Sequence, residues 1–131
     1  MDTIASLIAG LGHEDPWARN HVALALRDLG PAAAPAVPAL IATLADDNLS
    51  VRGAAVQALE AIGVAAKEAV EPLLLVAARD PCLFVRATAL DALAIIAPRD
   101  IRLMMDLPYL LGPPLVRKCA PRAVELLRTF P

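Results

Sequence analysis

Hydrophobic and polar residues recur along this chain with the spacing of helices. In residues 49–62 the apolar positions lie three or four residues apart, so that they share one face of a helix. That face consists of Val51, Ala54, Ala55, Ala58, Leu59 and Ile62. The pattern predicts an amphipathic helix over 49–62 whose apolar face needs a neighbour to cover it.

The same pattern returns in successive copies. Residues 6–19 align without a gap on residues 39–52 at an offset of 33, and these align on residues 73–86 at an offset of 34. Arginine recurs at one position of each copy, as Arg19, Arg52 and Arg86. A weaker fourth copy begins at LVRKCAPRAVELL, where Arg117 follows 31 residues after Arg86. A repeat of this length indicates stacked structural units.

Each copy divides into two helices. The second helix is expected over about 35–45 in one copy and about 66–78 in the next. Its start lies near Pro35, Pro38 and Pro72, where a missing backbone N–H costs least. Because its residues are apolar nearly all round, we expect this helix to be buried on two sides.

The first helix of each copy has signals for its start and its end. In the middle copy an N-cap is available among residues 46–48. In the next copy Asp80 precedes Pro81, which predicts an N-cap followed by proline at the first helical position. Gly30 and Gly63 are expected to end two of these helices.

No single hairpin of this kind can cover its own apolar face, so the copies must stack, each against its neighbours. The predicted fold class is all-α: an α-solenoid of about three and a half stacked helical hairpins, in one domain over 1–131. Its units are expected over 1–12 (half a unit), 13–45, 46–79, 80–112 and, as a partial unit, 113–131.

The recurring phrase D-x-x-x-x-V-R-x-x-A-x-x-A-L-x-x-I/L-G resembles the short HEAT repeats first noted in phycobiliprotein lyases. One copy carries it on Asp46, Val51, Arg52, Ala55, Ala58, Leu59 and Gly63. The next copy carries it on Asp80, Val85, Arg86, Ala89, Ala92 and Leu93. The resemblance covers residues 4–97 well and residues 98–131 poorly. It implies repeats that can serve a chromophore-attaching complex, with no lyase chemistry in the repeat itself.

The three recurring arginines predict a ladder between the copies. They stand in register, and a carboxylate before the helix of a neighbouring copy, Asp46 or Asp80, is the natural partner of each. A guanidinium can bind a carboxylate and loop carbonyls together. In the first copy His13 takes the place of the aspartate, so we expect an altered rung there. A substrate site at these arginines is the alternative.

Composition and charge narrow the function classes. The chain is 58% apolar with only 3% aromatic residues, and its net charge of −2 disfavours a general polyanion binder. Residues 99–131, however, carry six basic and three acidic side chains. The bases that could contact a nucleic acid are Arg117, Lys118, Arg122 and Arg128. The single Trp, the single Tyr and the acidic body count against that function.

Neither the cysteines nor the histidines indicate a reactive site. Cys82 and Cys119 lie in unrelated contexts, so we expect neither a disulfide nor a zinc site. His13-Glu14 resembles one ligand pair of the HEAT-like diiron enzyme deoxyhypusine hydroxylase, but the other copies have no such pair. We therefore expect no catalytic residues, no metal and no cofactor.

Sequence signals for membranes and secretion are also missing. No apolar run reaches the roughly 18 residues of a membrane span. The segment MDTIASLIAGLGHEDP has no basic region that would indicate a signal peptide. The expected location is the cytoplasm.

Departures from the repeat mark a candidate binding surface. Trp17, His21 and Leu24 lie along one edge of a helix at i, i+4 and i+7, and apolar residues stand where sister copies have polar ones. One interpretation is a docking patch with a tryptophan anchor. The alternative is local packing of Trp17 against the apolar residues in 4–8.

Two further surfaces are candidates for a partner. The second helices are expected to line a groove on the concave side of the solenoid, where the polar residues presented are Thr43, Lys67, Glu68, Glu71 and Arg79. Residues 98–114 contain four prolines and the apolar cluster Leu103, Met104, Met105, Leu107, Tyr109, Leu110 and Leu111. This segment is either a modified last hairpin over the core or an adaptable surface for a partner helix.

The expected function is a non-catalytic scaffold or adaptor that binds another protein, whose identity the sequence does not specify. The alternative is an accessory subunit or domain of an enzyme, of the lyase type, and a further alternative is nucleic-acid binding. The open ends of the solenoid also allow homo-oligomerisation, or continuation of the array in a longer protein.

Overall fold

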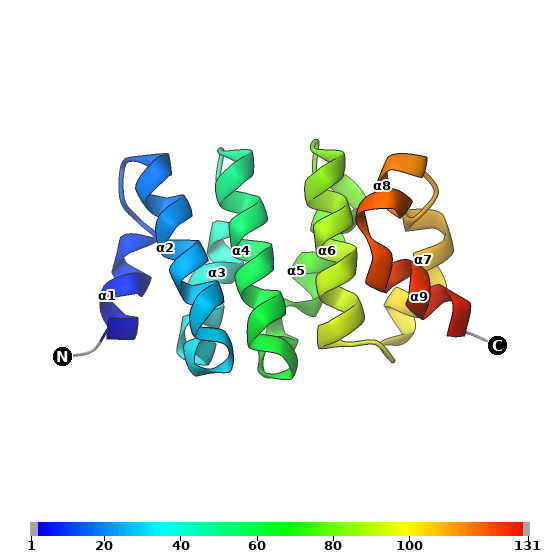
Figure 1. The fold of residues 1–131 in the computed structure, drawn as a ribbon, viewed down its shortest axis with the longest axis horizontal. Coiled ribbons are helices and arrows are strands. Elements are labelled where there is room, and N and C mark those ends of the chain that lie inside the picture. The colour runs from blue at the N-terminus through cyan, green and yellow to red at the C-terminus, as the bar shows by residue number, and fades with distance from the viewer. Residues whose placement is uncertain (1–2, 130–131) are drawn as a thin grey trace.

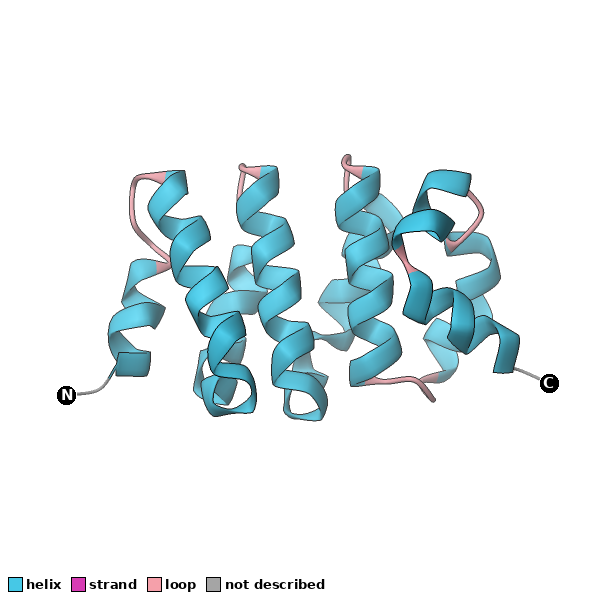
Figure 2. Cartoon of the chain, in the orientation of Figure 1, coloured by secondary structure: helices cyan, strands magenta, loops and turns pink. Residues whose placement is uncertain are grey.

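We describe the protein from a computed structural model, whose described residues are 3–129 without the side chains of residues 101 and 104. These residues form helices and loops, and there is no strand among them (Figure 2). The α-helices are α1 (Thr3–Gly10), α2 (Pro16–Leu29), α3 (Val37–Thr43), α4 (Leu49–Ile62), α5 (Val70–Arg79), α6 (Leu83–Ile96), α7 (Ile101–Leu110), α8 (Pro114–Cys119) and α9 (Pro121–Thr129). Two 3₁₀ segments, η1 (Gly30–Ala36) and η2 (Gly63–Ala69), precede α3 and α5.

The helices form a stack in two layers (Figure 1). The first helices of the repeats, α2, α4 and α6, lie side by side in one layer, and α3 and α5 lie behind them. The loops that lead into α2, α4, α6 and α8 lie at one edge of the stack (Figure 1). The predicted all-α solenoid of helical hairpins is therefore confirmed.

The first helices begin and end at the residues that the sequence marks. Asn48 caps α4, because its side-chain oxygen accepts hydrogen bonds from the backbone N–H of Ser50 and Val51. Gly63 ends α4 with a φ of 78°, and Gly30 ends α2 with a φ of 61°. Only glycine adopts this backbone conformation without strain.

The expected start of α6 is wrong by two residues. The N-cap of α6 is Cys82, not Asp80, and its side chain makes no capping hydrogen bond. The carboxylate of Asp80 accepts hydrogen bonds from the Arg52 guanidinium and from the backbone N–H of Cys82, which precedes the helix. The helix therefore starts at Leu83, and Pro81 lies before it.

The second helices also differ from the prediction, because each starts with a 3₁₀ segment. The sequence predicts continuous helices over about 35–45 and 66–78, whereas α3 starts at Val37 and α5 at Val70. Pro38 and Pro72 explain this difference. An α-helix that began a turn earlier would need a backbone N–H at these prolines, and the ring would meet the preceding turn.

About half of the buried apolar residues lie in the first helices α2, α4 and α6. In α4 the whole predicted apolar stripe is buried, and Gly53 and Val56 are buried as well. In α5, by contrast, Val70 and Leu73 are buried but Leu75 is 53% exposed. The prediction that the second helices are buried on two sides is therefore wrong, since no further layer within residues 3–129 covers them.

Helix α7 has one buried and one exposed apolar face. Leu103 and Leu107 are fully buried, which completes the core at this end of the stack. Met105 and Tyr109 are 74% and 84% exposed, four residues apart on the same stripe. The side chain of Met104, the other methionine of the predicted cluster, lies outside the described residues. The interpretation as a modified last hairpin over the core is supported by the buried face, and an adaptable surface for a partner helix stays a prediction for the exposed face.

Two glycine substitutions test the helix ends. We expect Gly63→Ala to lower the free energy of unfolding by about 1–3 kcal/mol, because alanine at this positive φ is strained. Gly53→Ala is the matched control: its Cβ would lie 4.0 Å from Val85 Cγ2, an ordinary contact, inside a helix. We expect this substitution to be stabilising by about 0.5–1 kcal/mol. Urea unfolding followed by circular dichroism measures both, and equal effects of the two substitutions would contradict this account.

Candidate protein-interaction surface

Two rungs of the predicted arginine ladder are present, and Arg19 forms the first. Its Nε donates to Asp46 Oδ2 at 2.8 Å and its Nη2 to Asp46 Oδ1 at 3.1 Å. Its Nη1 donates to the backbone carbonyls of His13 at 2.8 Å and Glu14 at 3.0 Å. One guanidinium thus joins its own loop to the loop of the next repeat.

Arg52 repeats this arrangement one unit further along. Its Nε and Nη2 donate to the two carboxylate oxygens of Asp80 at 2.8 and 3.2 Å, and its Nη1 donates to the carbonyls of Asp46 and Asp47. The side chain of Asp80 is only 4% exposed. The pKa of Arg52 is raised, mainly by its hydrogen bond to Asp80. The bidentate bond therefore stabilises the charged form of the Arg52 guanidinium.

Two opposing effects set the pKa of Asp46 in the first rung. Burial raises the pKa of Asp46, but the hydrogen bonds from Arg19 and from the backbone N–H of Asn48 outweigh burial and bring the pKa below its usual value. The arginine thus stabilises the ionised carboxylate in the folded state.

His13 preserves only the local part of the aspartate's role. Asp46 and Asp80 each accept a backbone N–H two residues further on, from Asn48 and Cys82. His13 Nδ1 accepts the backbone N–H of Asp15 in the same way, at 3.0 Å. The histidine therefore shapes the loop as the aspartates do, without contributing a carboxylate.

Arg86 departs from the predicted ladder. Its Nε donates to the backbone carbonyl of Asp80, but no carboxylate among the described residues accepts from its guanidinium. The position that Asp46 and Asp80 occupy in their repeats, six residues before the ladder arginine, is held by Leu111 in the fourth copy. Leu111 is fully buried. The expectation of a third paired rung is therefore wrong.

Trp17 is exposed rather than packed on the N-terminal residues. Its side chain is 68% exposed, and its ring meets the ring of His21 edge to face, with 5.0 Å between the centroids. Leu24 is half-buried and packs against the core, so it belongs to the interior. The predicted patch is thus reduced to Trp17 and His21.

Two more apolar side chains occupy the Trp17 position of their repeats. Phe84 and Leu115, each two residues before a repeated arginine, are 54% and 50% exposed. Only Ser50 in the second repeat is polar there. Leu115 was not a predicted site residue, although its place before Arg117 is the signal that would have found it. We call Trp17, His21, Phe84 and Leu115 the first-helix edge.

The polar residues predicted on the second helices are exposed with one exception. Lys67, Glu68, Glu71 and Arg79 are all exposed. Thr43 is only 7% exposed, and its hydroxyl donates to the carbonyl of Ala39 at 2.8 Å. The expectation that Thr43 is presented to a partner is therefore wrong, because its place in α3 turns it to the core.

Comparison with known proteins identifies the repeats. A family model described as HEAT repeats matches residues 1–60 and 37–111. This chain belongs to the HEAT-repeat family. Among solved structures it is similar to a chain in the complex of CpcE and CpcF of phycocyanin lyase from Nostoc sp. PCC7120. The two are 25% identical with a TM-score of 0.70, and the match covers 98% of this chain and 79% of that one. The curated proteins include no match.

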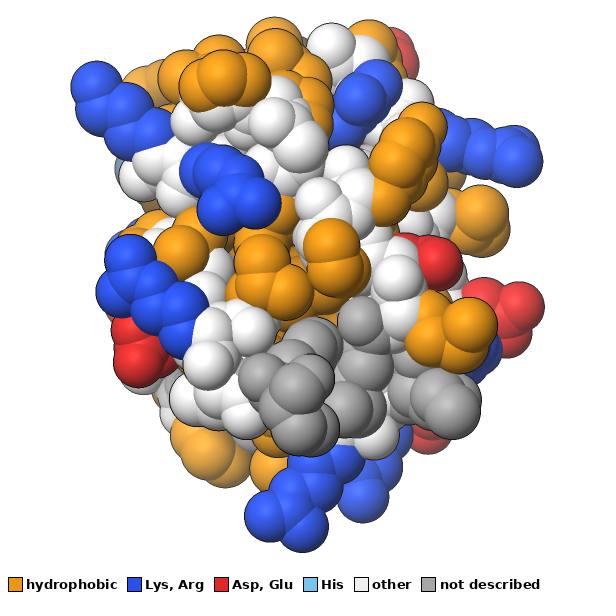
Figure 3. Space-filling view, turned by 90° about the vertical axis from the view of Figure 1, so that its right-hand side faces the viewer, with side chains coloured by type: hydrophobic (Ala, Val, Ile, Leu, Met, Phe, Trp, Pro, Cys, Tyr) orange, Lys and Arg blue, Asp and Glu red, His pale blue; other side chains and the backbone are white. Residues whose placement is uncertain are grey.

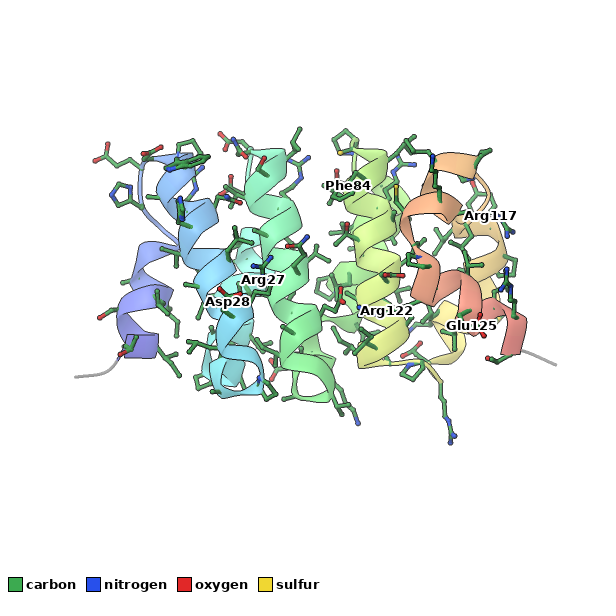
Figure 4. The ribbon with its side chains drawn as sticks, in the orientation of Figure 1. Arg27, Asp28, Phe84, Arg117, Arg122 and Glu125 are labelled. Carbon is green, nitrogen blue, oxygen red and sulfur yellow. The ribbon has the colours of Figure 1, made fainter. Side chains whose placement is uncertain are left out.

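The HEAT stack carries a second polar cluster, on the outer side of α4 and α6. Glu60 pairs with Arg122 of α9, and Asp91 accepts the backbone N–H groups of Arg122 and Ala123. Burial raises the pKa of Glu60 and Arg122 lowers it, with a net rise. Arg27 points from α2 towards α4 and donates to Gln57 (Figure 4). The contacts of Glu60 and Asp91 hold α9 against α4 and α6, and the contact of Arg27 joins α2 to α4.

The same pairs account for part of the basic tail. Arg122 is bound to Glu60, and Arg128 lies 3.4 Å from Glu125. Two of the four bases that could contact a nucleic acid are therefore already paired. No group of three or more His, Cys, Asp or Glu side chains between residues 3 and 129 is placed to hold a metal ion. None of the described helices is long and apolar enough to span a membrane.

Paired and unpaired ladder arginines should differ in their effect on stability. We expect Arg52→Ala to lower the free energy of unfolding by about 2 kcal/mol, because it leaves the buried Asp80 carboxylate without its partner. Arg86→Ala is the matched control and should cost less than about 1 kcal/mol, since it strands no carboxylate. Urea unfolding at neutral pH measures both. A larger effect of the Arg86 substitution would contradict the assignment of two rungs.

The first rung should make stability depend on pH. Because the folded pKa of Asp46 lies below the unfolded value of about 3.9, its contribution is complete above that pH and is lost as the pH falls through the folded value. We expect the difference in unfolding free energy between the wild type and Asp46→Asn to shrink between about pH 6 and about pH 2. Urea midpoints at the two values measure it. A difference that stays constant would show that the carboxylate is not stabilised by Arg19.

Proposed function

We propose that this chain is a non-catalytic HEAT-repeat module that binds another protein through its first-helix edge. The observation that carries the proposal is the exposure of Trp17, which is 68% accessible at a position where the second repeat has a serine. A large aromatic side chain exposed on a rigid helix is typical of an interface anchor.

The geometry of the edge favours binding for two physical reasons. Burying the exposed part of a tryptophan contributes about 2–3 kcal/mol of association free energy. The contact of Trp17 with His21 restricts the ring before binding, so less conformational entropy is lost. Phe84 and Leu115 repeat the apolar position along the same edge and extend the contact surface.

The similarity of this chain to one chain of a two-chain complex supports the proposal that it binds another protein. The similar solved structure is a complex of CpcE with CpcF, and the match spans nearly all of this chain. That structure also favours the second candidate function, an accessory subunit of a lyase-type enzyme. In both cases the chain supplies a preformed helical surface, and the proposal assigns no chemical step to its residues.

Site-directed photo-cross-linking at Trp17 tests this proposal. We expect p-benzoylphenylalanine at position 17 to give one defined cross-linked protein in the native cell, because the side chain lies in the interface. The same probe at the exposed Glu68, in η2 before the second helix α5, is the matched control. Sedimentation of the purified chain tests whether the partner is a second copy.

Affinity for the cross-linked protein then provides the quantitative test. Trp17→Ala should raise the Kd about 30-fold or more, the effect of removing an interface anchor of at least about 2 kcal/mol. Ser50→Ala, at the equivalent position of the next repeat, should leave the Kd unchanged. Unchanged affinity of the Trp17 variant together with a lowered Tm would mean that the ring serves only local packing.

A further inference from the structure

A cavity of about 490 Å³ lies between α5, α6, α7 and α8. Arg86 is the one charged residue among the described side chains that line it. The rest of the wall is mainly apolar, and Pro108, Tyr109, Leu110 and Pro113 form it on the side of α7 and the following loop. The cavity thus combines a guanidinium with an apolar rim.

This cavity lies between a ladder arginine and the loop of the next repeat. In the first two rungs that loop supplies the carboxylate, from Asp46 to Arg19 and from Asp80 to Arg52. In the third rung the loop residue is Leu111, whose side chain is buried in the core. The arginine is retained where its acceptor has been replaced.

The donors of Arg86 are only partly used. Its Nε is bound to the carbonyl of Asp80. The Asp80 carboxylate is bound to Arg52 and to the backbone of Cys82, so it does not serve Arg86. The four N–H groups of the two terminal nitrogens therefore have no acceptor among the described residues. The two terminal nitrogens can together bind both oxygens of a carboxylate end-on, whereas Arg19 and Arg52 use Nε and Nη2.

We propose that this cavity binds an aspartate or glutamate side chain of the partner protein, flanked by an apolar residue, in place of the missing ladder carboxylate. This inference rests on the proposed function, since it names the chemistry of the same partner. The acidic group would lie against the guanidinium of Arg86, and the apolar neighbour would contact Pro108 and Tyr109.

Two observations favour a protein side chain over a free anion. A single arginine at a partly exposed site holds an isolated ion weakly, because water competes for it. The rim, however, offers an apolar contact beside the charge, and Tyr109 is 84% exposed there. The face that carries α7 to α9 also shows apolar side chains interspersed with Lys and Arg (Figure 3). Its basic excess attracts an acidic partner.

Titration of the whole chain with blocked dipeptides tests the proposal without the natural partner. The probe is N-acetyl-Leu-Asp-amide, and its controls are N-acetyl-Leu-Asn-amide and sodium acetate. We expect saturable shifts of the Arg86 Nε–Hε signal in NMR spectra at neutral pH, with a Kd on the order of 1–10 mM for the Asp dipeptide. The Asn dipeptide should bind at least about ten-fold more weakly. The signals of Arg19 and Arg52 should not move.

Three variants give the inference its controls. Arg86→Gln should weaken binding of the Asp dipeptide at least about ten-fold. Arg79 is exposed and lies outside the cavity wall, so Arg79→Gln should leave this binding unchanged. Tyr109→Ala should weaken binding of the Asp dipeptide about three-fold or more and leave binding of acetate unchanged, because it removes only part of the apolar rim. Since Tyr109 is largely exposed, this variant keeps the test valid even if Arg86→Gln fails to fold.

The outcomes separate this inference from the proposed function. Equal shifts with the Asp and Asn dipeptides, or no saturable shift, would overturn the cavity assignment. Equal binding of acetate and the Asp dipeptide in the wild type and in Tyr109→Ala would mean that the cavity holds an adventitious ion only, and would also overturn it. Neither result affects the cross-link at Trp17, and a missing cross-link would not alter the titration.

Discussion

Close contact between successive first helices determines the geometry of this molecule. The buried faces of these helices carry small side chains: Ala54, Ala55 and Ala58 of α4 and Ala87, Ala89 and Ala92 of α6 are buried. Because alanine lets helix backbones approach closely, an arginine in one repeat reaches the loop of the next. The bidentate bonds of Arg19 and Arg52 depend on this spacing. They join loops that the apolar core has already brought together.

Both proposed contacts lie where this regular arrangement changes. A repeat supplies its own reference, since a side chain that the stack needs recurs in every copy. Trp17 stands where the second repeat has a serine, and Leu111 stands where two repeats have an aspartate. In the first case an apolar group is exposed without a structural need, and in the second an arginine loses its acceptor. Both proposed contacts use groups that make no such recurring contact within the stack.

Some features of the fold and of the candidate site could be predicted from the sequence and others could not, for physical reasons. The start of α4, the glycine ends and the pairs of Arg19 with Asp46 and Arg52 with Asp80 follow from local pattern and register, and all are confirmed. The 3₁₀ segments were missed, because apolar periodicity does not distinguish a 3₁₀ turn from an α-turn. Thr43 was misplaced because its exposure depends on the exact rotation of α3. The missing third rung was readable, since Leu111 lies six residues before Arg117.

The position of the two proposed contacts constrains the partner further. Trp17 lies in the first turn of α2 and Arg86 in the first turn of α6, and both turns lie at the same edge of the stack (Figure 1). Neighbouring packed helices are about 8–10 Å apart, so the two turns are separated by roughly 20 Å. An extended chain covers that distance in about six residues, and a helix in about thirteen. A partner segment that uses both contacts therefore has its apolar anchor and its acidic residue at one of these separations, whereas a shorter separation can satisfy only one of the two sites.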